Sequence, residues 1–255
     1  MQSAFTGKRV LVTGGSRGIG RGAVEAFLKS GARVALNGRT AESTAAAISV
    51  IGNSAGLVAA PGDVSSVADC ETIVGAAIEG LGGLDVLVNN AGVGKDGTIE
   101  DFDEAAWDET LDTNLKGTFF SIRSALAALR ASKCSIVNVA SDAGLMGQVG
   151  LIVYGASEGG VVNMTRAMAR ELAPDVRVNC VYPGYVDTDM VRRDYIDWAA
   201  DPAAVEREIM EFAPMKRMAT VGETASAILY LASADAGFIT GSALQIKGGS
   251  TAGRD

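Results

Sequence analysis

The 255-residue chain contains no histidine and only three cysteines, Cys70, Cys134 and Cys180. The absence of histidine argues against a zinc site and against any catalytic triad built on an imidazole. The cysteines are unevenly spaced and lie in largely apolar surroundings, so they form neither a disulfide framework nor a C-x-x-C metal cluster. Such cysteine usage favours a reducing compartment, and we expect a cytoplasmic protein.

Positive charge is also scarce, with 22 Lys and Arg against 30 Asp and Glu and a net charge of −8. This charge argues against a nucleic-acid partner, because a phosphate backbone would be repelled. No uninterrupted apolar run approaches the length that crosses a bilayer, and the N-terminus lacks the apolar core of a signal peptide. Apolar residues (48%) and glycines (32) are plentiful instead, which suits one large α/β domain with many tight turns.

Apolar runs alternate with helical patterns along the whole chain. Continuous apolar runs are typical of strands buried on both faces, and helices between them predict a single-domain Rossmann-type fold with a parallel, doubly wound sheet. The predicted strands are Arg9 to Val12, Arg33 to Asn37, Leu57 to Ala60, Asp85 to Asn89, Ser135 to Val139, Arg177 to Val181 and Ala243 to Ile246. No composition shift marks a second domain, so one domain over residues 1–255 is expected. An irregular insertion spans about 185–218.

A glycine-rich turn follows the first predicted strand. Residues Thr13 to Gly20 read TGGSRGIG and open the amphipathic stretch Arg21 to Ser30. Glycines let the backbone approach a pyrophosphate, and the free N–H groups at the start of the following helix favour negative charge. The turn therefore predicts a nucleotide site, although tight turns of any kind also use glycine.

Three further elements follow in order: Asn89-Asn90-Ala91-Gly92 after another apolar run, Asn114 in a helical stretch, and Ser141 thirteen residues before Tyr154. With these four elements the chain resembles the short-chain dehydrogenase/reductase family, and within it members of the 3-oxoacyl-carrier-protein reductase kind. The resemblance runs from Gly7 to about Gly249. It implies a nicotinamide cofactor and interconversion of a ketone and a secondary alcohol.

The resemblance also assigns cofactor contacts. Asp63 matches the position that bonds the adenine amino group, and Pro183, Gly184 and Thr188 match the loop that holds the nicotinamide carboxamide. The full set of expected cofactor-binding residues is Gly14, Ser16, Arg17, Gly18, Ile19, Gly20, Arg39, Asp63, Val64, Asn90, Ala91, Gly92, Tyr154, Pro183, Gly184, Val186 and Thr188. In isolation Asp63 could simply cap the next helix, and Pro183-Gly184 would only indicate a turn.

Charge at the end of the second strand favours NADP(H) over NAD(H). An acidic residue there would hold both ribose hydroxyls of NAD, whereas a basic residue would meet the extra phosphate of NADP. The strand ends Leu36-Asn37-Gly38-Arg39-Thr40, without a carboxylate and with Arg39 placed for charge-assisted bonds to phosphate. Arg17 adds a second cation. Arg39 could otherwise be a solvated charge at a helix start.

The expected catalytic residues are Asn114, Ser141, Tyr154 and Glu158. By the resemblance, Ser141 bonds the substrate oxygen, Tyr154 is the acid/base and Asn114 helps to hold a water relay. A phenol has an ordinary pKa near 10, so a lysine one helical turn further on normally lowers the pKa of this tyrosine. This chain has Glu158 there. A negative charge would destabilise the phenolate, so proton transfer is expected to be severely impaired.

A second departure lies after the last predicted strand. Related chains commonly carry Asp-Gly-Gly there, whereas this chain reads Lys247-Gly248-Gly249. Compared with related chains, position 158 has an acid in place of a lysine, and position 247 has a lysine in place of an acid. This suggests a charge exchange in which Lys247 faces Glu158, with coincidence of two unrelated changes as the alternative.

Two functions remain open from the sequence. The first is an NADP(H)-dependent oxidoreductase acting on a small or medium ketone or secondary alcohol, and the second is a non-catalytic nucleotide-binding protein that uses the same pocket as a sensor. The segment Gly94 to Phe102 and the insertion are expected to shape the pocket. The helix from Tyr154 to Leu172 carries apolar residues around much of its circumference, which, with the resemblance, predicts a homotetramer. Packing within the chain is the alternative.

Overall fold

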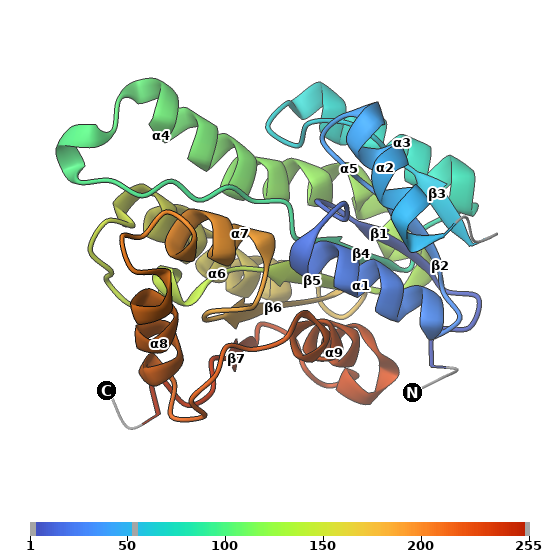
Figure 1. Ribbon diagram of the computed structural model, residues 1–255. Coiled ribbons are helices and arrows are strands. Elements are labelled where there is room, and N and C mark those ends of the chain that lie inside the picture. Colours follow the sequence, from blue (N-terminus) through green and yellow to red (C-terminus); the bar gives the residue numbers. More distant parts are fainter. Residues whose placement is uncertain (1–3, 53–55, 253–255) are drawn as a thin grey trace.

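The computed structural model describes residues 4–52 and 56–252, apart from the side chains of Asp194 and Tyr195. Seven parallel strands form one sheet in the order β3-β2-β1-β4-β5-β6-β7 (Figure 1). The strands are β1 Arg9–Val12, β2 Arg33–Leu36, β3 Leu57–Ala59, β4 Val86–Asn89, β5 Ser135–Val139, β6 Arg177–Pro183 and β7 Ala243–Ile246. The predicted doubly wound sheet is confirmed. β6 runs two residues further than predicted because Tyr182 and Pro183 still pair with β7.

Helices connect the strands and cover both faces of the sheet. They are α1 Gly18–Lys29, α2 Ala41–Ile51, α3 Val67–Leu81, α4 Glu104–Leu111, α5 Gly117–Ser132, α6 Ile152–Leu172, α7 Asp189–Val191, α8 Pro202–Phe212 and α9 Val221–Ala232. Shorter helical turns are η1 Ile99–Asp101, η2 Asp112–Lys116, η3 Asp142–Gly144, η4 Arg192–Ile196 and η5 Ala234–Ala236. Within the described residues, no helix is long and apolar enough to cross a bilayer.

Alternate residues of each strand enter two separate cores. On β1, Leu11 packs with Ile73, Ile122 and other residues of α3, α5 and α6. Its neighbours Val10 and Val12 pack on the opposite face with Phe27 of α1 and with α2 and α9. Successive side chains of a strand point to opposite faces, which is why an unbroken apolar run fits a sheet covered on both sides.

The apolar residues of α6 are mostly used inside the chain. Val161 and Val162 are buried with Cys180 and Tyr182 of β6, and Met168 packs against the core on the same face of the sheet. Packing within the chain, the alternative to an interface, therefore accounts for these side chains, and the helix gives no separate support for a tetramer.

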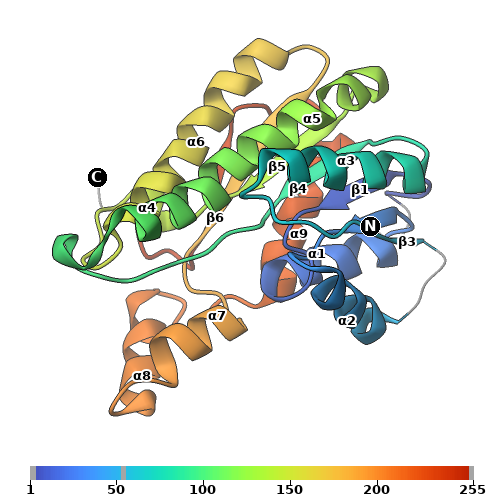
Figure 2. The same ribbon diagram turned by 90° about the horizontal axis from the view of Figure 1, so that it is seen from above.

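The irregular insertion forms a small body beside the sheet, which we call the lid and define as residues 185–218. It contains α7, η4 and α8, and both ribbon views show α8 standing away from the strands (Figures 1 and 2). Ile196, Ile209 and Met218 form a separate apolar cluster there, with Tyr185, Val191 and Val205 against it. The lid therefore has a core of its own.

The glycine turn is held by a close approach of two backbone segments. A Cβ added to Gly20 would run into the Gly14 carbonyl oxygen and the Asn90 side-chain nitrogen. Because these are the atoms that fix the turn against the end of β4, α1 can start at this point only if residue 20 has no side chain. Gly20 thus serves the packing of the turn.

We expect Gly20→Ala to destabilise the fold by about 1–3 kcal/mol, the usual cost of overpacking. Gly75→Ala is the matched control, because Gly75 also lies inside a helix but a Cβ there meets nothing within 4 Å. The control should be neutral or slightly stabilising. Urea unfolding of the three proteins measures both effects, and equal midpoints would contradict the packing role of Gly20.

Candidate active site

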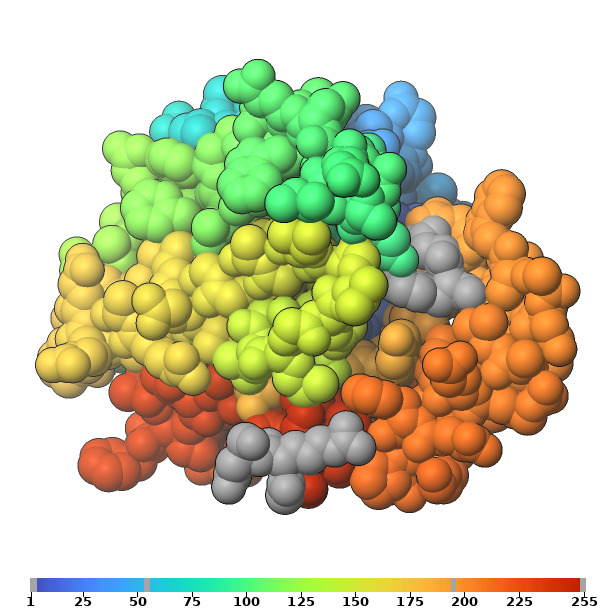
Figure 3. All heavy atoms as spheres, turned by 90° about the vertical axis from the view of Figure 1, so that its left-hand side faces the viewer, coloured from blue at the N-terminus to red at the C-terminus, as the bar shows by residue number. Residues whose placement is uncertain are grey.

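A cavity of about 1190 Å³ opens at the carboxyl ends of the strands, where β1 and β4 lie next to each other and the connections turn to opposite sides. Ligands of open α/β sheets bind at such a switch point. Figure 3 shows a furrow between the lid, coloured orange, and the yellow-green surface preceding α6. The predicted residues that line the cavity are Gly14, Ser16, Arg17, Gly18, Ile19, Arg39, Asp63, Val64, Asn90, Ala91, Gly92, Asn114, Ser141, Tyr154, Glu158, Pro183, Gly184, Val186 and Thr188.

Gly20 and Asn89, which belong to the sequence motifs, do not line the cavity. Gly20 lies behind the glycine turn, where it allows the close approach described above. Asn89 ends β4 inside the sheet, where its side-chain nitrogen donates to Asn138 Oδ1 at 2.9 Å. Both residues support the site from behind, and Asn90 is the neighbour that lines the cavity.

The glycine turn is anchored by side chains of adjacent strands. Asn37 Oδ1 accepts a hydrogen bond from the Gly14 N–H at 3.1 Å, while Asn37 Nδ2 donates to the carbonyl of Ala60. Asn90 Nδ2 donates to the carbonyls of Thr13 and Gly14. No role was predicted for the Asn37 side chain, although a polar residue that follows an apolar strand is a usable signal.

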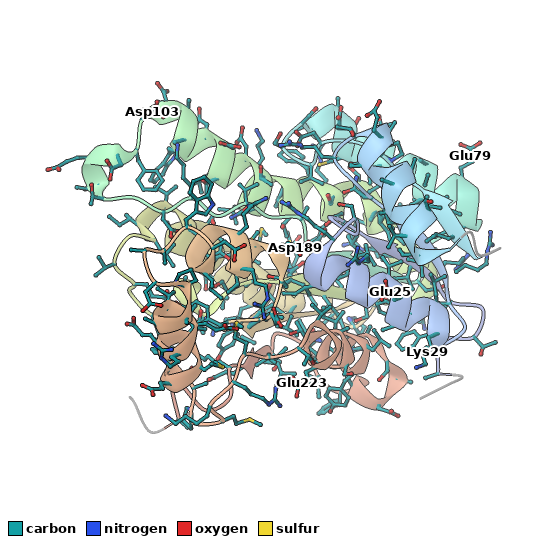
Figure 4. The ribbon with its side chains drawn as sticks, in the orientation of Figure 1. Glu25, Lys29, Glu79, Asp103, Asp189 and Glu223 are labelled. Carbon is teal, nitrogen blue, oxygen red and sulfur yellow. The ribbon has the colours of Figure 1, made fainter. Side chains whose placement is uncertain are left out.

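The start of α1 carries no acidic residue in its first turn and no side-chain cap on Arg17. By contrast, α2, α3 and α9 are capped by the side chains of Thr40, Ser66 and Thr220. Gly18 and Ile19 of this uncapped turn line the cavity. In Figure 4, Asp189 at the start of α7 lies beside this end of α1, in line with the close approach of Thr188 to Gly18. Free N–H groups at a helix start fit a phosphate group.

Arg39 lies at the far end of the cavity, exposed and close in sequence to the hydroxyls of Thr40 and Ser43, which also line it. No carboxylate stands at the end of β2. Asp63 lines the same part of the cavity, and its Oδ1 accepts a hydrogen bond from the Ser65 N–H at 3.0 Å. Asp63 does not cap the next helix, which was the simple alternative for it, because the cap of α3 is the side chain of Ser66.

Asn114 lies in η2, a single π-helical turn between α4 and α5 in which the Gly117 N–H bonds the Asp112 carbonyl. Such turns are frequent at functional sites because the extra residue redirects a side chain. Asn114 is buried, and its side chain makes two hydrogen bonds of 2.9 Å to the backbone of Val93. Its Oδ1 accepts from the Val93 N–H, and its Nδ2 donates to the Val93 carbonyl. Nδ2 also reaches Ser157 Oγ at 3.0 Å and Glu158 Oε1 at 3.3 Å.

Ser141 and Tyr154 line one end of the cavity, Ser141 at the end of β5 and Tyr154 in the first turn of α6. Ser141 Oγ accepts from the Ala143 N–H and lies 3.5 Å from Asp142 Oδ1. Burial raises the pKa of the Asp142 carboxyl, and the positive charge of Lys247 partly offsets this effect. Asp142 was not among the predicted site residues, although a charged residue soon after a buried strand is a signal of a site.

Glu158 is buried, with only 5% of its surface exposed. Its Oε2 atom has no hydrogen-bond partner in the described structure. Burial, the sole cause, raises the pKa of this carboxyl from 4.5 to about 8. At neutral pH the side chain is therefore mainly a neutral acid, which corrects the expectation of a negative charge beside Tyr154. Position 158 therefore lacks the positive charge of a lysine but does not carry a negative charge instead.

Lys247 does not pair with Glu158. Among the described ion pairs none joins these two residues, and Lys247 makes no contribution to the pKa of Glu158. Its ammonium lies 5.1 Å from the centre of the Tyr182 ring and 3.7 Å from Met146 Sδ, and the carboxyl that feels its charge is Asp142. The hypothesis of a direct charge exchange is wrong.

We expect Glu158→Gln to stabilise the protein increasingly as the pH rises. Glu158 keeps its proton up to about pH 8 in the folded chain but only up to about pH 4.5 in the unfolded chain. Between these pH values the natural chain therefore becomes easier to unfold as the pH rises, whereas Glu158→Gln has no such proton to lose. The difference in unfolding free energy should grow by about 3 kcal/mol between pH 5.5 and 8. Urea unfolding at several pH values measures it. Glu79→Gln, an exposed change on α3 (Figure 4), is the control, and equal pH profiles for both variants would contradict the burial effect.

Comparisons with known proteins agree with this geometry. The family model for short chain dehydrogenase matches residues 8–197. The chain belongs to the short-chain dehydrogenase family. It is 37% identical to 2-(S)-hydroxypropyl-CoM dehydrogenase 3 of Xanthobacter autotrophicus, over 99% of this chain and all of that one. It is 34% identical to the 3-oxoacyl-[acyl-carrier-protein] reductase of Salmonella typhimurium, over 96% and 98%.

A solved structure shares the fold over the same extent. The glucose/ribitol dehydrogenase-type short-chain dehydrogenase of Brucella melitensis superposes with a TM-score of 0.91 at 36% identity, covering 98% of this chain and 99% of that one. Members of the short-chain dehydrogenase family use nicotinamide cofactors and act on CH–OH groups of small molecules, so this chain is an oxidoreductase of that kind. The uncapped start of α1 and the unpartnered Oε2 of Glu158 both fit a dinucleotide with phosphates and sugar hydroxyls.

Proposed function

We propose that this short-chain dehydrogenase interconverts a ketone and a secondary alcohol with NADP(H), Tyr154 being the acid/base, and that its proton-transfer step is severely impaired. The observation that carries the proposal is one cavity that joins the glycine turn and Arg39 to Ser141, Tyr154 and Glu158. When bound, the nicotinamide cofactor supplies or accepts the hydride. The chain itself has to bind the cofactor and the substrate and to move one proton.

The proton step depends on the phenol of Tyr154. Its hydroxyl donates a proton to the developing alkoxide during reduction and takes it back during oxidation. Ser141 at the end of β5 supplies a hydroxyl for the substrate oxygen, and Asn114, fixed by Val93, fills the space behind Glu158. An ammonium one turn after Tyr154 would stabilise the phenolate, and a neutral carboxyl supplies no such charge. The impairment thus follows from a missing attraction.

Replacing Glu158 by lysine should restore the missing charge. We expect Glu158→Lys to raise the rate of NADPH oxidation with small and medium ketones on the order of a thousandfold, since a few pKa units on the phenol correspond to that factor. Steady-state absorbance of the reduced nicotinamide measures the rate. Glu158→Gln is the control and should match the natural chain at pH 7, where both side chains are neutral. Equal rates for the natural chain and Glu158→Lys would refute the impairment.

Arg39 supports the choice of NADP(H). It is exposed at the end of the cavity next to β2, a strand that does not end in a carboxylate, so a phosphate beside Arg39 meets a cation and nearby hydroxyls. We expect Arg39→Gln to weaken NADPH binding about tenfold while leaving NADH binding nearly unchanged. Fluorescence titration with both nucleotides measures the two dissociation constants. Arg21→Gln removes a cation from α1 outside the cavity lining and serves as control; equal losses for both nucleotides would contradict the preference.

A second function is favoured by the burial of Glu158. A site that has lost its cation but kept its glycine turn is what a non-catalytic NADP(H)-binding sensor would need. NADPH titration followed by a single-turnover assay separates the two functions, because binding without hydride transfer favours the sensor. Retention of Asn114, Ser141 and Tyr154 together supports the oxidoreductase.

The substrate end of the cavity is partly apolar. Leu151, Tyr185, Met190 and Trp198 line it together with the segment Val93 to Asp96. Such a lining supports a small or medium substrate with an apolar part. A homotetrameric assembly and a cytoplasmic location stay predictions of the sequence.

A further inference from the structure

Only one of the two carboxyl oxygens of Glu158 has a hydrogen-bond partner in the described structure. Oε1 accepts a hydrogen bond from Asn114 Nδ2 at 3.3 Å. Oε2 is buried and has no partner in the described structure, while the residue as a whole lines the large cavity. A buried polar atom without a partner costs free energy, and native structures tolerate it mainly where a ligand or water completes the bond.

Glu158 is fixed from behind. A Cβ added to Gly144 of η3 would collide with the backbone of residues 158 and 159, so this part of α6 packs directly on η3. Asn114 in turn is held at both ends by Val93. The carboxyl therefore has little freedom to turn Oε2 toward solvent, and the group that can reach it is one that enters the cavity.

The charges around Glu158 do not favour its ionised form. On α6 itself the titratable and charged neighbours are Tyr154 one turn earlier and Arg166 two turns later. The elements packed against α6 bring Cys180, whose burial raises its pKa to about 11, and Tyr182 from β6, Asp142, which feels the charge of Lys247, from η3, Asp108 and Glu109 from α4, and Asp112 and Lys116 from η2. None of them shifts the pKa of Glu158, which burial alone raises to about 8.

We propose that Glu158 binds the cofactor directly as a neutral carboxylic acid, with Oε1 held by Asn114 and the Oε2 hydroxyl donating to a sugar hydroxyl of the dinucleotide. The inference rests on the proposed function for the identity of the ligand. In such a ligand each ribose is joined to the pyrophosphate, so a pyrophosphate at the glycine turn leaves one ribose on the side of Tyr154. The acid thereby donates a hydrogen bond to the sugar without bringing a charge.

The sign of the pH dependence follows from the ligand's own charge. The pyrophosphate brings negative charge into the cavity, which further opposes ionisation of Glu158. Binding then requires the protonated form, and affinity falls as the pH rises. An ionised Glu158 that accepted bonds from the sugar hydroxyls would give the opposite trend, because its affinity would grow as the proton leaves.

The experiment measures NADPH binding from pH 7 to 9.5 by nicotinamide fluorescence, with NADH as a second probe. In the natural chain we expect affinity to be level near pH 7 and to fall above pH 8 by up to about tenfold per pH unit. Glu158→Gln has the same shape, keeps a donor and cannot ionise, so its affinity should stay level. Calorimetry at pH 8.5 in buffers of different ionisation enthalpy should show proton uptake on binding by the natural chain and none by Glu158→Gln.

The possible outcomes separate this inference from the proposed function. Parallel pH profiles for the natural chain and Glu158→Gln, or tighter binding with proton release at high pH, would overturn the role of Glu158 and leave the cofactor in place. Binding by Glu158→Lys alone would overturn it as well. If neither the natural chain nor Glu158→Gln or Glu158→Lys binds NADPH or NADH, the proposed function fails and the inference falls with it.

Discussion

A carboxyl buried without a neighbouring cation is the constraint on which the chemistry of this chain depends. Glu158 lies in the wall of the cavity, one turn after Tyr154, and only 5% of its surface is exposed. Under these conditions the side chain avoids the charge by keeping its proton. The residue that looks from the sequence like a reversal of charge is, in the folded protein at neutral pH, closer to a removal of charge. The phenol of Tyr154 therefore lacks a stabilising positive charge nearby but does not face a negative charge at position 158.

The fold could be predicted almost entirely from the sequence. Three predicted strands, Arg9–Val12, Ser135–Val139 and Ala243–Ile246, match the structure at both ends, because each is an apolar run bounded by turn residues. The parallel order followed from the helices between the runs. The limits of β6 were missed because Tyr182 and Pro183 belong to the ladder with β7, and pairing of distant residues leaves no local signal.

The motifs predicted which residues lie together in the fold but not the electrostatics around them. The motifs located the glycine turn, Asn114, Ser141 and Tyr154, and the structure brings them to one cavity. The protonation of Glu158 and the partner of Lys247 could not be read in this way. Both depend on burial and on distances between elements that meet only in the fold. Asn37 was missed for a related reason, since its contact with Gly14 joins two strands across the sheet.

The lid has a consequence for how this chain can change over generations. Ile196, Ile209 and Met218 pack chiefly on one another and on their own segment, and Arg192 ties the segment to itself through Asp187 and Glu206. Mutations there disturb a miniature core and leave the sheet with its glycine turn untouched. Substitutions in this cluster can therefore accumulate over time, while the strands and the glycine turn of the nucleotide half are inherited unaltered.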